Sequence, residues 1–103
     1  MNTFESGQVR VLVYRDNADG VWYGSALEFN LTIDGTDKHA VLFELNHAID
    51  EYRRSAQEIG AVELLNQEPD PELVALWEAY INNTAVVSPY TSYFAGRESL
   101  QYA

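Results

Sequence analysis

The most constraining feature of this sequence is a change in the spacing of its apolar residues near position 35. Between residues 8 and 31 they alternate with a period of two, whereas between 40 and 59 they recur every three or four positions. Period two is typical of strands with two distinct faces, and a spacing of three and four is typical of an amphipathic helix. The chain is therefore predicted to begin with strands and to continue into a helix.

The strand region divides at Asp16-Asn-Ala-Asp-Gly20, where every residue type except alanine tolerates positive φ. We expect a hairpin loop there, between strands over 8–14 and 21–31. A third strand is predicted over 31–34 and ends at Gly35. One face of the second strand carries Trp22, Gly24, Ala26, Glu28 and Asn30.

The helical pattern over 40–59 has suitable residues at both ends. Thr36 or Asp37 can cap its first turn, and Gly60 is suited to end it. A second helix is predicted to start at Pro71, with Asp70 as its cap, and to fade near Asn82.

Two segments have no clear period. Residues 62–65, Val-Glu-Leu-Leu, fit either a fourth strand or a helical extension, and we favour the strand. The tail over 84–103 is expected to be irregular and to pack on its own domain or on a neighbouring subunit, because so much aromatic surface is seldom left in water. Its aromatic residues are Tyr90, Tyr93, Phe94 and Tyr102.

These elements predict an α+β fold, in which an antiparallel sheet of three or four strands packs on one main helix. A second helix and the tail follow. Residues 1–68 and 69–103 are expected to form one compact unit, since 103 residues suit a single domain. With helices on one side only, the other face of the sheet would stay open.

The charge of the chain restricts its partners. The net charge is −10, and the six basic residues are scattered, so nucleic-acid binding is not expected and a basic protein partner is favoured. The absence of cysteine excludes disulfides and thiolate metal sites. The first seven residues lack the features of a signal peptide and no apolar stretch approaches a membrane span, so we expect a cytoplasmic protein without membrane contact.

Glu28 is the first candidate for a catalytic group, because it interrupts an apolar run. A catalytic carboxylate needs a second acid, a base or a metal nearby. Asp34, Asp37 and Asp50 have the right chemistry, but their spacing defines no metal geometry. Since charged residues are mostly exposed, we favour a half-exposed Glu28 beside Asn30 on the sheet, or a Glu28 that pairs with a basic side chain of a partner.

No other motif indicates catalysis. His39 and His47 lie two helical turns apart, too far to chelate one ion, and neither a nucleophile elbow nor a phosphate-binding loop occurs. We therefore expect no cofactor, no metal and no enzymatic activity. The alternative is a hydrolase that uses carboxylates such as Glu28, Asp34 and Asp50 around Mg²⁺, by analogy with complete ribonuclease H folds.

Tyr14 and Trp22 are the candidate interface aromatics of the sheet. Both are predicted to lie on the face opposite Val9, Val11 and Val13, either as core under a helix or as an exposed patch. Apolar residues on both faces of the first two strands favour a homodimer formed through the sheet or its edge. A structural subunit that only oligomerises is a further alternative.

Several segments resemble the N-terminal domain of the HicB family. They are Val11-Leu-Val-Tyr-Arg-Asp16, Asp19-Gly-Val-Trp-Tyr23, Ala26-Leu-Glu-Phe-Asn-Leu31, Gly35 and a helix that opens with Ala40. The resemblance covers roughly residues 8–60. The turn before Ala40 is one residue shorter than the family pattern, with His39 where Glu is usual.

The resemblance implies a partial ribonuclease-H-like βββαβ unit without nuclease residues. It also implies an antitoxin that binds and blocks HicA, a small basic toxin that cleaves RNA. Residues 69–103 resemble the short extension of stand-alone HicB-like proteins and not a DNA-binding domain. The candidate partner-binding residues are Tyr14, Trp22, Glu28 and Asn30, and the candidate oligomer contacts are Tyr90, Tyr93 and Phe94.

Overall fold

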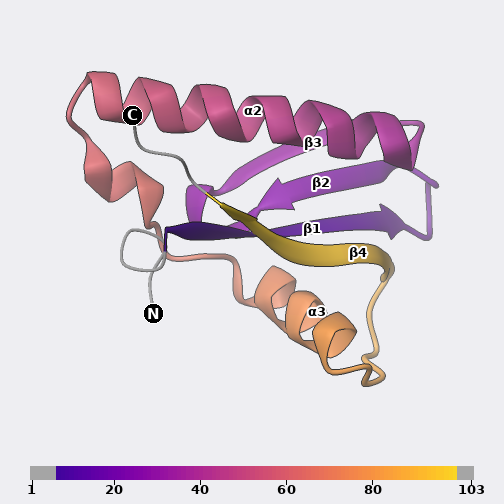
Figure 1. Ribbon diagram of the computed structural model, residues 1–103. Helices are drawn as coiled ribbons and strands as arrows, with labels where there is room; N and C mark the ends of the chain where they lie inside the picture. The colour runs from indigo at the N-terminus through magenta and orange to yellow at the C-terminus, as the bar shows by residue number, and fades with distance from the viewer. Residues whose placement is uncertain (1–6, 100–103) are drawn as a thin grey trace.

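The computed structural model describes residues 7–99, which form a four-stranded sheet with a helix against each face (Figure 1). The strands are β1 (Gln8–Asp16), β2 (Trp22–Ala26), β3 (Leu31–Gly35) and β4 (Tyr90–Ser99). Their order in the sheet is β3-β2-β1-β4, and every neighbouring pair is antiparallel. The main helices are α2 (Lys38–Glu58) and α3 (Pro71–Ile81). The predicted α+β class, with an antiparallel sheet on one main helix, is confirmed.

The hairpin between β1 and β2 forms where the sequence predicts it. The carboxylate of Asp16 accepts the Ala18 N–H at 2.8 Å, that of Asp19 accepts the Val21 N–H at 2.8 Å, and Gly20 has φ 75°. These aspartates bind the backbone two residues on, as short polar side chains do in turns.

The second strand is shorter than predicted. β2 ends at Ala26, a 3₁₀ turn over Leu27–Phe29 follows, and Asn30 reverses the chain into β3 with φ 50°. Asparagine enters this left-handed conformation more readily than most residues. The period-two pattern runs through the turn because the turn buries Leu27 and Phe29 in different clusters of the core.

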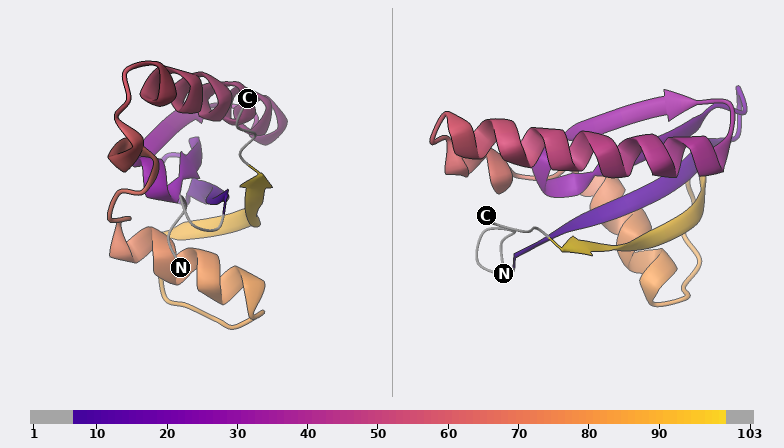
Figure 2. Two further views of the ribbon diagram at one scale, coloured as in Figure 1. Left: turned by 60° about the vertical axis from the view of Figure 1, so that its left-hand side comes forward. Right: turned by 45° about the horizontal axis from the view of Figure 1, so that its top comes forward.

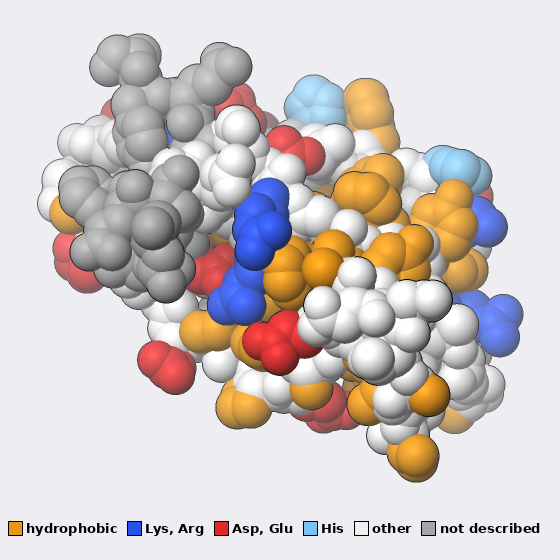
Figure 3. Space-filling view, turned by 60° about the horizontal axis from the view of Figure 1, so that its bottom comes forward, with side chains coloured by type: hydrophobic (Ala, Val, Ile, Leu, Met, Phe, Trp, Pro, Cys, Tyr) orange, Lys and Arg blue, Asp and Glu red, His pale blue; other side chains and the backbone are white. Residues whose placement is uncertain are grey.

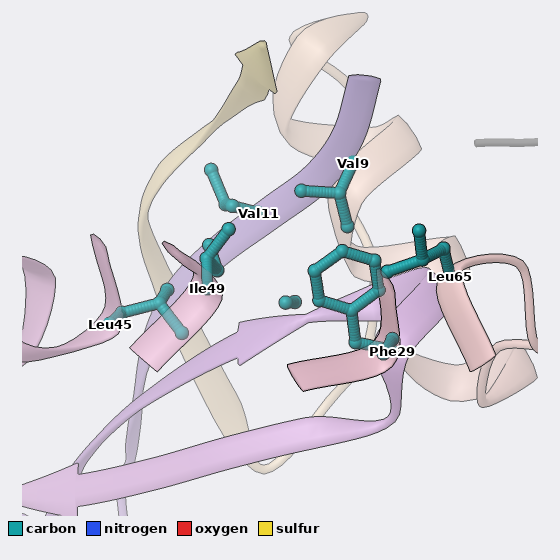
Figure 4. Close-up of a cluster of buried hydrophobic side chains, with 8 residues drawn as sticks. Val9, Val11, Phe29, Leu45, Ile49 and Leu65 are labelled. Carbon is teal, nitrogen blue, oxygen red and sulfur yellow. The ribbon is translucent and has the colours of Figure 1, made fainter. Parts of the chain in front are cut away.

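Helix α2 begins and ends as expected. The carboxylate of Asp37 accepts the Ala40 N–H at 2.9 Å, and Gly60 follows the last turn with φ 73°. Its buried residues Leu45, Ile49 and Ala56 form one core cluster with β1, the end of β2, the 3₁₀ turn and residue 65 (Figure 4). The labelled members are Val9, Val11, Phe29, Leu45, Ile49 and Leu65.

The predicted strand over 62–65 is wrong, since these residues form a second 3₁₀ helix, Val62–Leu65. Leu65 is fully buried in the cluster under α2, and the Gln67 N–H donates to the Glu28 carbonyl at 2.7 Å. The segment therefore packs against the 3₁₀ turn over Leu27–Phe29 and adds no strand. A four-residue segment with three apolar residues is too short to show a period that could distinguish these outcomes.

The expectation of an irregular tail is also wrong, because residues 90–99 form β4 and pair with β1 along its whole length. The tail thus packs on its own domain, with one bulge where Val13 faces Phe94 and Tyr14 faces Ser92. Because β1 and β4 are about 80 residues apart in the chain, their pairing leaves no local pattern from which the strand could be predicted. Tyr102 lies outside the described residues.

The sheet does not have a wholly open second face. Helix α3 packs beneath it, on the side opposite α2 (Figure 2), and forms a second cluster that includes Leu12, Tyr14, Trp77 and Ala95. The helices are staggered, since α2 contacts mainly β2 and β3 whereas α3 contacts β1 and β4. Each face of the sheet therefore has one half that its helix does not cover.

Close packing between β2 and α2 predicts that Gly24→Ala destabilises the fold. A Cβ at position 24 would lie 2.8 Å from Val41 Cγ1 and 3.2 Å from Leu45 Cδ2, both in the core. Overpacking of this kind costs about 1–3 kcal/mol of unfolding free energy, measurable by urea denaturation. Gly20→Asn is the control, since no atom lies within 4 Å of its Cβ and asparagine tolerates positive φ. Equal stability of Gly24→Ala and the unsubstituted protein would contradict this packing.

Candidate functional site

Glu28 is not half-exposed, as the sequence suggested, but buried in a pair with Arg10. Its Oε1 accepts the Arg10 backbone N–H at 2.9 Å, and its Oε2 accepts from Arg10 Nε at 2.7 Å and lies 2.7 Å from Arg10 Nη2. The Glu28 side chain is only 9% exposed. Because β2 ends at Ala26, it has no residue to pair with Arg10 of β1, and the Glu28 carboxylate accepts the Arg10 N–H instead.

The same arginine contributes to a stack on Trp77 of α3. The guanidinium of Arg10 lies 5.4 Å from the indole centroid, and that of its cross-strand neighbour Arg97 lies 4.6 Å away. Two facing like charges repel, and the aromatic face and the Glu28 carboxylate offset this repulsion. Glu28 is thus occupied within its own chain.

The other carboxylates of the hydrolase alternative do not join Glu28. Asp50 binds Arg53 at 2.7 Å and Arg54 at 2.6 Å on the outer surface of α2, and Asp34 is exposed on β3. Hydrogen bonding to Arg53 is the main reason that the pKa of Asp50 is lowered. Among residues 7–99, no group of three or more His, Asp or Glu side chains is placed to hold a metal ion.

Asn30 also has a role within the chain. Its amide donates to Gln67 Oε1 at 3.4 Å and to the Glu68 carbonyl at 3.2 Å, which ties the turn before β3 to the segment before α3. Gln67 in turn donates to the Phe29 carbonyl at 3.1 Å. These contacts hold the connection between the two helices against the sheet.

Tyr14 belongs to the core under α3, the first of the two alternatives drawn from the sequence. It is 6% exposed, and its hydroxyl lies 3.2 Å from Ser25 Oγ. Burial raises the pKa of Tyr14, because the phenolate would lose its hydration. Tyr90 packs edge-on against it, with ring centroids 5.2 Å apart.

Trp22 lies on the opposite face from the one predicted. The register pairs it with Arg15 and Gly35, which places its side chain on the same face as Val13. Residue parity within one strand cannot be carried across a five-residue loop, and this is why the prediction was wrong. Trp22 and Tyr14 therefore do not form one patch.

Trp22 instead meets Tyr93, one of the candidate oligomer contacts. Their rings are nearly perpendicular at 81°, with centroids 5.8 Å apart. Lys38 Nζ, from the first turn of α2, lies 4.3 Å from the Tyr93 centroid and 5.6 Å from that of Trp22. His39 packs edge-on against Tyr93 at 6.1 Å. Three separate elements thus build an aromatic cluster.

The cluster is accessible because the staggered helix α2 leaves β4 uncovered on this face. Tyr93 and Phe94 are each 36% exposed, and Trp22 is half-buried. Figure 3 shows hydrophobic side chains running as a band from basic groups near its centre toward the two histidines at the upper right. Large aromatic side chains in such settings are the usual anchors of protein interfaces.

The opposite side of the same end of the sheet is acidic. Tyr23 points there, and its pKa is raised by partial burial and then by the negative charges of Asp19, Asp16 and Asp34. Thr32 and Asp34 of β3 are exposed beside it. Here α3 leaves β2 and β3 uncovered, so these carboxylates remain in water.

We call this region the hairpin-end surface. It consists of Asp16, Asp19, Trp22, Tyr23, Asp34, Lys38 and Tyr93. The Trp22–Tyr93 cluster lies on the side of α2, and the acidic groups lie toward the opposite side, around Tyr23. The sequence had indicated Trp22 and Tyr93, but it gave no sign that they touch or that Lys38 joins them, since the contact depends on the β1–β4 pairing.

A hollow of about 640 Å³ lies between α3 and the start of β4. Its lining includes Ala79, Tyr80, Thr84 and Tyr90 but no charged or imidazole group. It therefore lacks the carboxylate and imidazole groups that most often serve as catalytic acids, bases and metal ligands. No helix between residues 7 and 99 combines the length and the apolar content that crossing a bilayer requires.

Comparisons of the chain with protein-family models, curated proteins and solved structures found no significant match. The likeness to HicB proteins remains a prediction from the sequence patterns.

The buried ion pair predicts that Glu28→Gln is destabilising. The amide places an NH₂ group against Arg10 and leaves its guanidinium without a counter-charge, which costs about 2 kcal/mol of unfolding free energy. Asp50→Asn is the matched control, because it also removes a carboxylate bound to arginine but lies half-exposed on α2. Urea denaturation of both variants should show a much larger loss for Glu28→Gln. Equal losses would contradict a structural role for Glu28.

Proposed function

We propose that this chain is a non-enzymatic protein-binding domain whose partner docks on the hairpin-end surface. The observation that carries the proposal is the Trp22–Tyr93 cluster, which lies partly exposed beside α2, at the end of the sheet whose opposite face is acidic. Its rings are held by β2 and β4 of a packed sheet, so little side-chain entropy is lost on binding.

The chemistry of the surface favours a basic partner. The chain carries a net charge of −10. Two of its six basic residues, Arg53 and Arg54, are bound to Asp50 on α2. The exposed Asp19 and Asp34 belong to the hairpin-end surface and would speed the approach of a positively charged protein.

The specific form of the proposal is an antitoxin that masks the RNA-binding surface of a small basic toxin. It is supported by the resemblance of residues 8–60 to HicB antitoxins and by the acidity of the chain. A basic RNA-cleaving protein must present cationic groups to phosphates, and an acidic partner competes for those groups.

If a small basic protein is encoded beside this chain, the proposal predicts that Trp22→Ala weakens binding to it at least about tenfold, because a central aromatic anchor is lost. Phe43→Ala is the control: Phe43 is 65% exposed, on the outer surface of α2, and its loss should leave affinity unchanged. Calorimetric titration at low salt gives both values, and RNA cleavage by the partner reports inhibition. The proposal fails if no such protein binds, or if Trp22→Ala binds as tightly as the unsubstituted chain.

A second candidate function, self-association, is favoured by the outer edge of β4. The N–H of Asp16, the last residue of β1, donates to the Val21 carbonyl on the β2 side, and the N–H of the next residue, Asn17, donates to the Pro89 carbonyl on the β4 side. Because backbone groups alternate in direction along a strand, the odd-numbered residues of β1 bond to β4. Gly96 pairs with Val11, and Arg97 therefore turns its backbone outward. Within residues 7–99 no strand lies beyond this edge, which leaves it open to a second copy.

Self-association through this edge predicts a difference between two substitutions at one position. Arg97→Pro removes the outward N–H and should abolish the dimer, whereas Arg97→Ala keeps the N–H and should retain it. Light scattering gives the oligomeric state, and circular dichroism shows whether each variant is folded. A monomeric unsubstituted protein at millimolar concentration, or a dimer that survives in folded Arg97→Pro, would rule this candidate out.

A further inference from the structure

The arrangement of Trp22, Tyr93 and Lys38 is that of a cation site filled from within the chain. The two rings stand at 81° to each other, and one ammonium group lies within 6 Å of both centroids. Cations bind aromatic faces through the ring quadrupole at this range, and tryptophan is the strongest of the aromatic side chains in this respect. Two rings at a right angle form the walls of a partial aromatic cage.

Lys38 is a weakly held occupant of this cage. It is the first residue of α2, next to the cap Asp37, and a positive charge at a helix N-terminus is opposed by the helix dipole. No ion pair of Lys38 with a carboxylate is found among residues 7–99. Its flexible stem lets the ammonium move into water, where it is well hydrated.

The surroundings favour an external cation over an anion. Asp37 precedes Lys38 in the chain, and Asp16, Asp19 and Asp34 lie at the same end of the sheet, toward its opposite face, so they contribute negative potential without lining the cage. His39 adds a third ring at the edge of Tyr93. If Lys38 leaves, the faces of the Trp22 and Tyr93 rings become free to receive another cation.

We propose that Trp22 and Tyr93 form a binding site for an ammonium or guanidinium group, which Lys38 occupies in the free chain and an external cation displaces. The inference deepens the proposed function, because the displacing group would be a lysine or arginine of the docked partner. The site itself is testable without any partner. Lys38 competes with external cations for the two rings and so lowers the apparent affinity of the site for them. Cations that bind the rings weakly do not displace it.

The test uses choline as the probe and its neutral isostere 3,3-dimethylbutan-1-ol as the control ligand. The reporter is the indole N–H resonance of Trp22 in NMR spectra, recorded at constant ionic strength. Trp77 supplies an internal reference, because it is already covered by Arg10 and Arg97. Lys38→Met removes the internal cation and keeps an apolar stem.

We expect choline to shift the Trp22 resonance with an affinity about fivefold higher in Lys38→Met than in the unsubstituted chain. The neutral isostere should bind much more weakly. Adding Tyr93→Leu to Lys38→Met should abolish the response, whereas adding Phe43→Leu, outside the cage, should not.

Three results would overturn the inference. They are equal choline affinity with and without Lys38, equal affinity for choline and its isostere, and a response that survives Tyr93→Leu in a folded protein. None of them depends on the partner. A chain that binds choline but no basic protein would instead refute the proposed function and leave the cation site standing.

Discussion

Strand β1 imposes the main constraint on this structure, because it is apolar on both faces. Val9, Val11 and Val13 point to one side and Leu12 and Tyr14 to the other, and none of them is more than 6% exposed. A strand of this kind needs a neighbour on each edge and a layer on each face. The first 60 residues supply β2 on one edge and α2 on one face. The last third of the described chain supplies β4 and α3, which complete the enclosure.

The two helices are staggered because α2 packs mainly on β2 and β3, whereas α3 packs on β1 and β4. This stagger determines which parts of the sheet stay exposed. Helix α2 covers the β2–β3 half of one face, so aromatic residues of β4 stay accessible beside it. Helix α3 covers the β1–β4 half of the other face, so the polar and acidic groups around Tyr23 stay in water. Both uncovered halves meet at the hairpin end of the sheet, where Trp22 and Tyr23 point in opposite directions from adjacent positions. Aromatic side chains and negative charge therefore lie at the same end of the molecule, on opposite faces of the sheet.

Glu28 shows how a residue that looks functional in the sequence can be structural. An acid in an apolar run is equally consistent with catalysis, with partner binding and with burial against an internal arginine. The choice depends on Arg10, 18 positions earlier, and on the 3₁₀ turn that points the carboxylate at its backbone and side chain. With the charge neutralised within the chain, the aromatic cluster is the more promising site for recognition.

Interactions between residues close together in the sequence determine most of the secondary structure of this protein. The strand and helix periods, the aspartate-rich hairpin, the Asp37 and Asp70 caps and Pro71 at the start of α3 each depend on residues a few positions apart. They therefore fixed the α+β class and most element boundaries, and the strongly negative charge is a matter of composition. Only tertiary structure decided that the aromatic tail becomes an edge strand, that residues 62–65 turn, that Trp22 shares a face with Val13, and that Lys38 reaches Trp22 and Tyr93. The edge strand and the Lys38 contact depend on β1 meeting a segment about 80 residues away, residues 62–65 depend on packing against the turn over Leu27–Phe29, and the face of Trp22 depends on the register across the hairpin loop. None of these contacts leaves a period, a cap or a turn signal in the sequence.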